Sequence, residues 1–394
     1  MPVPRFAPLR ALAPATLLAL ALAAPAPLHA AESRAFVLET DFSTGSFSAV
    51  NLATKAPACD VASVFEDAGL RYHAGRVYVF NRLGADNIQE LDPVTYATLL
   101  QFSVGNGANP HDIAFASPTK AYVTRYETTD LWIVNPQTGA RTGSISLAAF
   151  ADADGIPEMD REQMVGPLLF VSLQRVNRNA GFTPTDSALV VVVDTRADTV
   201  VDCDPALPGK QAILLPHTNP VTAFQFDPAT SRLLIGCAGN YGVLDGGVDR
   251  VDPVALRADG TAATEDSLGG DIADVVWKDG SKAYAIVSDA SFNTSLVSWS
   301  PQTGRRLATL YAPGGFTLAD AALDDRGGLW VANSSTTTPG LHVFDTATDT
   351  PVGGAIACAL PPAAIAFDDA AAGVAGVPPP APALALGAPR PDPA

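Results

Sequence analysis

The sequence predicts an all-β protein, a seven-bladed β-propeller of four-stranded antiparallel blades. Two short phrases each occur seven times along the chain, always in the same order, and the two ends of the repeat region supply complementary parts of one blade. Repeats of about 40 to 45 residues with four short strands each are typical of propellers, in which neighbouring sheets bury one another's faces.

The first thirty residues are predicted to be an export signal rather than part of the fold. Arg5 and Arg10 give the segment a positive start, residues 11–24 form an apolar stretch too short to span a bilayer, and Ala30 ends an imperfect small-residue cleavage site. No cysteine lies nearby to accept a lipid. We therefore expect a Sec-type signal peptide without a lipobox, and a periplasmic or secreted protein.

Both repeated phrases have a physical reason. The first is a short run of aromatic and β-branched residues, which fit a pleated, half-buried strand. Its copies begin at Arg34, Arg76, Lys120, Leu168, Arg232, Lys282 and Gly328. The second is a hydrophobic residue followed by Asp, Asn or Ser and then a turn rich in Pro, Thr and Gly, which is hairpin chemistry. Its copies begin at Val50, Leu91, Val134, Val193, Val251, Trp299 and Phe344.

The two ends of the repeat region predict how the ring closes. The first repeat starts at Phe36 without an inner strand, whereas residues 362–367 form a strand candidate with no repeat of its own. Pairing of these two segments would complete one blade and remove the exposed strand edges. We therefore assign residues 1–30 to the signal peptide, 31–370 to the propeller and 371–394 to a disordered tail rich in Pro and Ala.

The negative charge of the chain disfavours some classes of binding partner. The formal net charge is −17, and removal of residues 1–30, which hold two arginines and no acids, makes it −19. Such an acidic chain is not expected to bind nucleic acid or anionic membranes, and no apolar segment beyond residue 30 is long enough for a membrane span.

An even number of cysteines in an oxidising compartment favours disulfides over a metal site. We expect the pairs Cys203–Cys237 and Cys59–Cys358, although spacing alone does not fix the connectivity.

Residues 109–145 resemble the YVTN repeat of bacterial seven-bladed propellers. Tyr122, Val123 and Thr124 match the motif literally, and an apolar strand and an Asn-Pro-x-Thr-Gly turn from Asn135 follow them. The resemblance extends over the chain to about residue 369. It implies the propeller fold, but the family includes surface and periplasmic binding propellers, lactonase-like enzymes and quinoprotein-like domains, so it does not select a function.

The spacing of the repeats indicates where a site should lie. Successive turn phrases are 41, 43, 59, 58, 48 and 45 residues apart, so the extra residues are confined to the middle blades. They fall in connections that should all emerge on one face of the ring, where loops on a rigid scaffold commonly build binding surfaces. These insertions are residues 149–163, 174–187, 206–219, 238–247 and 259–270.

Residues 150–160 contain a candidate calcium site. Asp152 and Asp154 alternate before a glycine, and Glu158 and Asp160 follow, which provides several of the oxygen ligands that a hard cation needs. The segment lacks the third aspartate and the final glutamate of an EF-hand loop. An acidic, capped surface turn is the alternative interpretation, so calcium is the candidate cofactor and no other cofactor is indicated.

Three groups of polar residues are candidate ligand contacts. Arg175, Asn177, Arg178 and Asn179 form a dense polar loop, and Asn240, Tyr241, Asp245 and Asp271 could add hydrogen bonds and a stacking ring. Asp112, Asp274 and Asp320 recur at the start of inner strands and could gather around a central channel. Solvated loops in the first two cases, and hydrogen bonds that tie neighbouring blades in the third, are the structural alternatives.

The sequence favours a binding module over an enzyme. Catalytic motifs such as GxSxG and HExxH are absent, and only four histidines follow the signal segment, of which His111 beside Asp112 is the catalytic candidate. The leading hypothesis is an exported propeller that binds a small molecule, a glycan or a protein through its middle-blade loops. A lactonase-like or other metal-assisted hydrolase is the alternative, and a quinone-dependent dehydrogenase fits less well because only four tryptophans occur.

Overall fold

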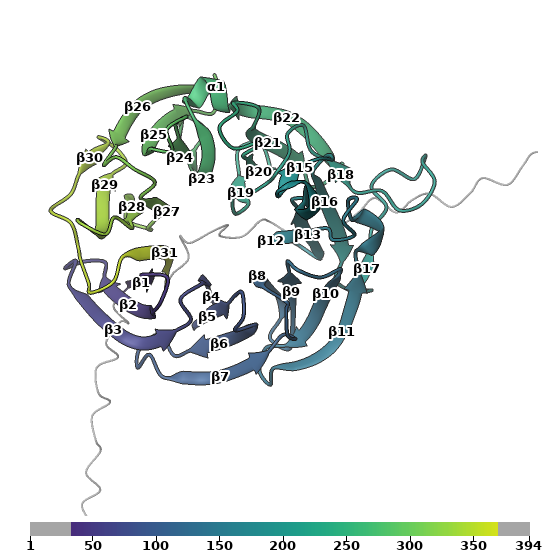
Figure 1. The fold of residues 1–394 in the computed structure, drawn as a ribbon, viewed down its shortest axis with the longest axis horizontal. Helices are drawn as coiled ribbons and strands as arrows, with labels where there is room; N and C mark the ends of the chain where they lie inside the picture. Colours follow the sequence, from purple (N-terminus) through teal and green to yellow (C-terminus); the bar gives the residue numbers. More distant parts are fainter. Residues whose placement is uncertain (1–32, 369–394) are drawn as a thin grey trace, which may run out of the picture. The chain divides into compact units, whose positions relative to one another are not determined.

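Apolar strands joined by hairpin turns fold each repeat into a small antiparallel sheet in the computed structural model, which describes residues 33–368. Seven such sheets form a ring, and each sheet has one strand near the centre and one at the rim (Figure 1). The predicted seven-bladed β-propeller is therefore confirmed.

Six blades follow the chain from the inner strand to the outer strand. Blades 2 and 3 consist of β4 (Ala68–His73), β5 (Arg76–Asn81), β6 (Asn87–Leu91) and β7 (Thr98–Ser103), and of β8 (Pro110–Ser117), β9 (Lys120–Arg125), β10 (Asp130–Asn135) and β11 (Ala140–Ser146). Blades 4 and 5 consist of β12 (Met159–Val165), β13 (Leu168–Leu173), β16 (Leu189–Asp194), β17 (Thr199–Val200) and β18 (Ile213–Leu214), and of β19 (Gln225–Asp227), β20 (Arg232–Cys237), β21 (Gly247–Asp252) and β22 (Arg257–Thr264). Blades 6 and 7 consist of β23 (Asp271–Asp279), β24 (Lys282–Ser288), β25 (Thr294–Ser300) and β26 (Arg305–Tyr311), and of β27 (Leu318–Leu323), β28 (Gly328–Asn333), β29 (Gly340–Asp345) and β30 (Thr350–Pro351).

Blade 1 joins the two ends of the repeat region. Its strands in order from the centre are β31 (Pro362–Phe367), β1 (Arg34–Thr40), β2 (Gly45–Asn51) and β3 (Pro57–Val64). β1 and β31 pair antiparallel, with Val37 opposite Ile365 and Phe36 opposite Ala366. The predicted closure of the ring is confirmed, and it leaves neither segment as an unpaired inner edge.

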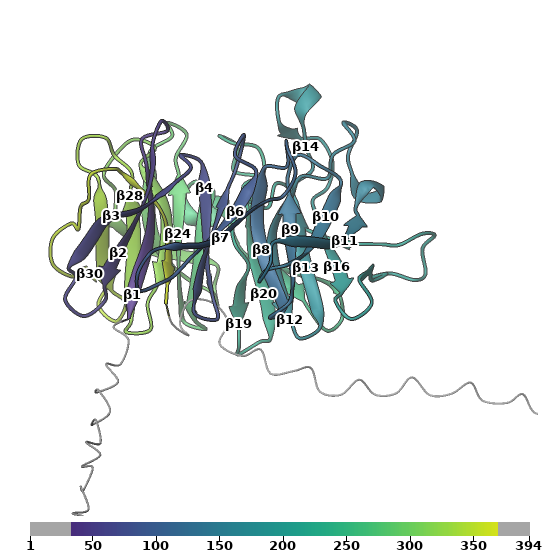
Figure 2. The same ribbon diagram turned by 90° about the horizontal axis from the view of Figure 1, so that it is seen from below.

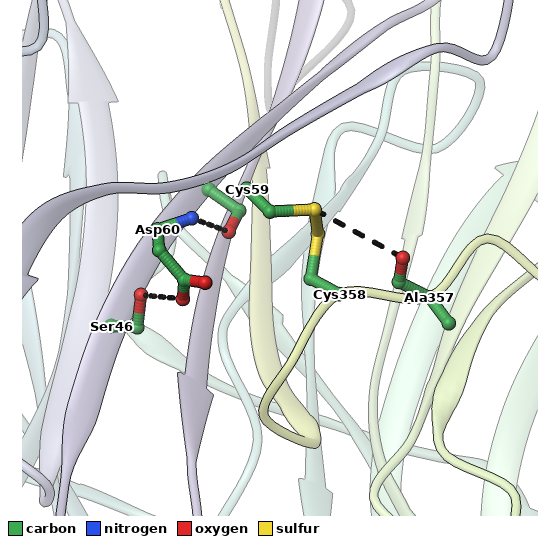
Figure 3. The surroundings of a disulfide bond; sticks show 6 residues. Ser46, Cys59, Asp60, Ala357 and Cys358 are labelled. Atoms are coloured by element: carbon green, nitrogen blue, oxygen red, sulfur yellow. Dashed lines mark hydrogen bonds between the residues drawn. A yellow bond between two sulfur atoms is a disulfide. The ribbon is translucent and has the colours of Figure 1, made fainter.

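A disulfide reinforces this closure. Cys59 on β3 bonds to Cys358, which lies in the connection from blade 7 to β31, with the two Cα atoms 5.5 Å apart (Figure 3). Beside it, Ser46 donates a hydrogen bond of 2.7 Å to Asp60, and the backbone N–H of Asp60 donates one of 3.0 Å to Ser48. One of the two predicted disulfides is thus confirmed.

The other predicted disulfide is wrong, because Cys203 and Cys237 are free thiols. Cys237 is fully buried in β20, and its sulfur lies 3.7 Å from a carboxylate oxygen of Asp249 on the neighbouring strand β21. Cys203 follows β17 in a segment that leaves blade 4. Burial raises the pKa of Cys203 to about 11, so its thiol is protonated at neutral pH.

Apolar side chains of neighbouring blades share their cores. Seven clusters of buried residues lie between successive blades, one for each blade interface. At the interface of blades 1 and 2, for example, Phe36 and Phe47 pack with Val77, Val79 and Leu91. Each sheet therefore buries both faces only when the ring is complete.

The tyrosine of the repeated phrase has a second role at these interfaces. The Tyr122 hydroxyl donates to the Asp198 carboxylate in the next blade, and the Tyr284 hydroxyl donates to Asp349 over 2.8 Å. Lys282 adds an ion pair of 3.0 Å to the same Asp349. The recurrence of Lys-Ala-Tyr in the sequence therefore reflects contacts between blades as well as strand formation.

The loops between the second and third strands of each blade, together with the connections between blades, lie on one face of the ring, which we call the loop face. Two insertions enlarge it at blade 4: residues 147–158, with the 3-10 turn η1 (Ala148–Phe150), and residues 174–188. The second holds the small hairpin β14 (Val176–Asn177) and β15 (Thr183–Pro184), separated by η2 (Arg178–Ala180). Figure 2 shows the β14 segment rising beyond the strands of the ring.

Another insertion departs from the predicted common face. β17 and β18 both pair with β16, so the outer strand of blade 4 is split in two, and residues 201–212 connect the halves. Because this segment starts in mid-strand, it projects sideways from the rim (Figures 1 and 2). It therefore does not enlarge the loop face as the sequence predicted.

The structure does not test the predictions made for the two ends of the chain. The signal peptide at residues 1–30 and the tail at residues 371–394 lie outside the described part of the chain. Within residues 33–368, no helix is long and apolar enough to cross a membrane, and α1 (Glu265–Leu268) is a single capped turn.

Candidate functional site

The inner strands of five blades start at the loop face with a β-bulge, and four of these strands carry a charged residue there. In these four strands the bulges fall between Pro110 and Asp112 in β8, Met159 and Glu162 in β12, Ile272 and Asp274 in β23, and Leu318 and Asp320 in β27. A bulge re-aims a side chain, and such irregularities are common next to functional sites. The four strands thus present Asp112, Arg161, Asp274 and Asp320 at equivalent places around the centre of the ring.

The three aspartates tie neighbouring blades together. Asp112 accepts a hydrogen bond of 2.9 Å from the backbone N–H of Glu162, Asp274 accepts one of 2.9 Å from Ala321, and Asp320 accepts one of 2.6 Å from Ile365. In each case the donor belongs to the inner strand of the next blade. Their geometry therefore supports the interpretation that the three aspartates tie neighbouring blades through hydrogen bonds. It does not support three carboxylates that are free to bind a ligand.

Arg161 brings a positive charge among these acids, and the sequence analysis did not single it out. Burial acts to lower its pKa, but the carboxylates of Asp160, Asp112, Asp320 and Asp274 outweigh this effect and raise it. Burial also raises the pKa of Asp274, to about 6. The centre of the ring is consequently an arginine held among aspartates, with its side chain still 30% exposed.

Next to Arg161, four side chains form a hydrogen-bonded network across blades 3 and 4. His111 Nδ1 lies 2.8 Å from Asp160 Oδ1, and Gln174 Nε2 donates to Asp160 Oδ2 over 2.8 Å. The Tyr126 hydroxyl donates to Gln174 Oε1 over 2.6 Å, and the Tyr126 and His111 rings stack with centroids 4.2 Å apart. Each member fixes the orientation of the next, which is how a recognition or catalytic site is preorganised.

The protonation states in this network follow from burial and from its hydrogen bonds. Burial lowers the pKa of His111, although Asp160 acts to raise it, so the imidazole is neutral at pH 7. Burial opposes ionisation of Asp160, but Arg161 and His111 lower its pKa below the usual value. The pair is therefore a neutral histidine held by an aspartate anion, which leaves His111 Nε2 as the ring nitrogen that is not engaged by Asp160.

The candidate calcium loop brings together three of its four predicted acids. Ligand oxygens of Asp152, Asp154 and Glu158 all lie within 4.8 Å of one another. Asp160, the fourth predicted acid, lies outside this group of three and bonds to His111 and Gln174. The cause lies in the backbone, because Glu158 has a φ of 45° and the regular strand β12 begins only at Met159.

The polar loop of blade 4 largely stabilises itself. Arg175 pairs with Asp186, and the Asn177 side chain accepts a hydrogen bond of 2.9 Å from the backbone N–H of Asn179, which caps η2. Arg178 reaches the acids, with its Nε 3.3 Å from Glu158 Oε1 and another nitrogen on Glu127. Of the four residues predicted in this loop, Arg178 therefore has the clearest link to the candidate site.

The loop of blade 5 between β20 and β21 exposes the ring of Tyr241 to solvent. Asn240 donates to Asp245 over 2.8 Å, and Asp271 accepts a hydrogen bond of 2.6 Å from the backbone N–H of Gly242. Between these contacts Tyr241 remains 62% exposed. Desolvation raises the pKa of Tyr241, and the negative charges of Asp160, Asp271 and Glu265 add to this effect.

A second histidine–aspartate pair was missed by the sequence analysis. His217 Nδ1 lies 2.7 Å from Asp249 Oδ1, and this hydrogen bond raises the pKa of His217. The Cys237 thiol contacts the same carboxylate, but burial raises its pKa far above the ordinary value, so it is not an activated nucleophile. No local motif could reveal the pair, because 32 residues separate its members.

A cavity at the other end of the same strands is a separate feature. It has a volume of about 240 Å³ and is lined by Arg71, His73, Phe115, Gln163 and Met164, among others. These residues lie on or next to β4, β8 and β12, and Arg71 also pairs with Asp112 over 2.6 Å. None of the predicted site residues lines this cavity.

Fold and site together define a seven-bladed β-propeller with a polar, aromatic-flanked cluster on its loop face. No family model and no curated protein matches the sequence. The chain is similar to a solved structure from Bacteroides uniformis ATCC 8492, provisionally assigned as a 6-phosphogluconolactonase, with 14% identity and a TM-score of 0.59, covering 85% of this chain and 99% of that one. It is also similar to a functionally unknown protein from Desulfotomaculum acetoxidans DSM 771, with 13% identity and a TM-score of 0.56, covering 85% and 98% of the two chains.

A third solved structure is less similar. It is Kuenenia stuttgartiensis hydrazine synthase, with 15% identity and a TM-score of 0.44, covering 61% of this chain and 64% of that one. The chain thus spans less than two thirds of the length of that protein. At these identities the comparisons show the propeller fold alone.

Proposed function

We propose that the protein is an exported binding module that holds a carbohydrate or another polyhydroxylated small molecule over the loop face of blades 3 to 5. The observation that carries this proposal is the His111–Asp160–Gln174–Tyr126 network on the loop face, together with the exposed Tyr241 on the blade 5 loop of the same face.

The chemistry of these groups suits sugar hydroxyls. Imidazole, amide, carboxylate and phenol groups offer both donors and acceptors at fixed positions. The Tyr241 ring is exposed, and aromatic rings supply a large, rigid apolar face with a polar tip. Arg161 adds a guanidinium group, which favours ligands that also carry a carboxylate, such as uronic acids.

The test is calorimetric titration of the mature protein with a panel of neutral and acidic mono- and oligosaccharides. We expect at least one sugar to bind, and Tyr241→Ala to weaken that binding by about tenfold or more, as expected for loss of an aromatic anchor. Phe292→Ala is the matched control, because Phe292 is 52% exposed on the corresponding loop of blade 6. It should leave the affinity unchanged.

Two results would contradict the binding proposal. The first is the absence of heat or competition with every sugar of the panel while the protein remains folded. The second is a bound sugar whose affinity falls equally in Tyr241→Ala and Phe292→Ala, because binding would then not depend on blade 5.

A hydrolase is the second candidate function, and one specific observation favours it. A neutral histidine oriented by an ionised aspartate can act as a general base. His111 and Asp160 meet this condition, with 2.8 Å between Nδ1 and Oδ1. Lactones and esters are the corresponding substrates, because their hydrolysis needs a base to activate water.

A panel of lactones and esters tests this second candidate. If the site is catalytic, we expect turnover that falls by about a hundredfold or more in His111→Ala and Asp160→Asn. His217→Ala, in the other histidine–aspartate pair, should keep full activity. Turnover that survives His111→Ala, or no turnover of any panel member, would remove the hydrolase from consideration while leaving the sugar titration as an independent test.

A further inference from the structure

We propose that Asp152, Asp154 and Glu158 bind a calcium ion that joins the connection 147–158 to the β14–β15 hairpin. Their carboxylate oxygens lie within 4.8 Å of one another. Two oxygens on opposite sides of a calcium ion are about 4.6 to 5.2 Å apart, because each lies about 2.3 to 2.6 Å from the metal. The three side chains are therefore spaced as ligands of one ion.

Orphaned oxygens are the second, independent observation. Asp152 Oδ2 and Glu158 Oε2 are both buried and accept no hydrogen bond from the described part of the protein. Glu158 is fully buried as a residue. A buried carboxylate oxygen without a donor or a cation is costly, and two of them in one cluster indicate a missing positive partner.

Backbone N–H groups hold the two aspartates in place. Asp152 Oδ1 accepts from Asp154 over 3.0 Å, and Asp154 Oδ1 accepts from Ile156 over 2.9 Å. Asp154 Oδ2 accepts a hydrogen bond of 2.8 Å from the backbone of Arg178 in the hairpin. The loop thus positions the acids before an ion arrives, which lowers the entropic cost of binding it.

Arg178 does not replace the ion. Its Nε lies 3.3 Å from Glu158 Oε1 and 3.9 Å from Asp154 Oδ2, while another of its nitrogens pairs with Glu127. It therefore contacts Glu158 through the oxygen that is not orphaned and divides its charge among three acids. A divalent cation between Asp152 and Glu158 would neutralise the remaining charge.

The donor set selects the kind of metal. All three ligands are carboxylates, which suit hard cations, whereas zinc and copper sites use His or Cys. Magnesium requires a nearly ideal octahedron with shorter bonds of about 2.0 to 2.1 Å, which a loop and a hairpin with one shared ion provide less readily than the flexible coordination of calcium. Water molecules and backbone carbonyl groups would complete the calcium coordination.

Metal titration of the full-length mature protein, stripped with a chelator, tests the proposal without any organic ligand. We expect one calcium ion per chain by calorimetry, and a higher Tm in millimolar calcium than in millimolar magnesium or EDTA. Asp152→Asn and Glu158→Gln should each weaken calcium binding by about tenfold or more. Asp152→Asn matters most, because Asp152 is partly exposed and its replacement is not expected to prevent folding.

A second Asp-x-Asp sequence in the same protein provides the matched control. Asp202 and Asp204 have the same spacing and lie in the segment that projects from the rim of blade 4. Asp202→Asn and Asp204→Asn should keep the calcium affinity. The proposal fails if the wild-type protein binds no calcium at millimolar concentrations, or if Asp152→Asn binds it as tightly as the wild type.

Discussion

Replacing Cys358 with serine is expected to lower the free energy of unfolding by about 3 to 5 kcal/mol. The bond to Cys59 closes a loop across a sequence separation of 299 residues, so it restricts the unfolded chain strongly. It also fastens blade 1 to the connection that leads into β31, the strand that completes the ring. Chemical unfolding of the oxidised wild type and the variant, followed by tryptophan fluorescence, measures the difference.

Cys203→Ser is the control for loss of a thiol without loss of the crosslink. Cys203 is a free, partly buried cysteine, and its replacement should change the stability by less than about 1 kcal/mol. A reducing agent should destabilise the wild type and Cys203→Ser but leave Cys358→Ser unaffected. Equal stability of the wild type and Cys358→Ser under oxidising conditions would show that the crosslink does not restrain the unfolded chain.

The strands and hairpin turns of the fold could be predicted from the sequence because every repeat carries the same pattern. The strand phrase of aromatic and β-branched residues and the turn phrase each occur seven times, so an error in placing the strands and hairpins of one repeat is corrected by the others. The pairing of the Phe36 segment with the Ile365 segment was predicted from the same phase, although the two lie at opposite ends of the described chain. Cys59–Cys358 then follows as a second link at that closure.

The candidate site was less predictable because single backbone irregularities determine it. The positive φ of Glu158 separates Asp160 from the acidic cluster and directs it to His111, 49 residues away in the sequence. Arg161 reaches the centre of the ring through a bulge in β12 that has no sequence signature. The split outer strand of blade 4 likewise places residues 201–212 at the rim of the ring and not on the loop face, where the sequence predicted an insertion.

The structure contains a buried acid that opposes folding at neutral pH. Glu39 on β1 is only 4% exposed, and its Oε2 has no hydrogen-bond partner in the described residues. Burial, opposed by a hydrogen bond from Ser48, raises the pKa of Glu39 from 4.5 to about 7. Burial raises the pKa of Glu265 to about 7 as well, so the effect is not confined to one blade.

The sign of the pH dependence follows from which state binds the proton more tightly. Because the folded protein keeps Glu39 protonated up to about pH 7 and the unfolded chain only up to about pH 4.5, the stability that neutral Glu39 provides is complete below pH 4.5 and is lost as the pH rises through 7. The loss amounts to about 3 kcal/mol at pH 8. Glu39→Gln, which cannot ionise, is therefore expected to be more stable than the wild type at pH 8 by about 1 to 3 kcal/mol, and to match it more closely at pH 4.5.

Urea unfolding of the wild type and Glu39→Gln at several pH values between 4.5 and 8 measures this difference. Asp325→Asn removes the same charge from the surface, where the Asp325 side chain is 43% exposed, and should follow the wild-type pH profile. If the gap between Glu39→Gln and the wild type stays constant with pH, Glu39 has the same pKa in the folded and unfolded states, and it is then ionised at neutral pH in the folded protein. Closure of the ring at β1 would then have to accommodate a buried negative charge, which the unpartnered Oε2 makes physically costly.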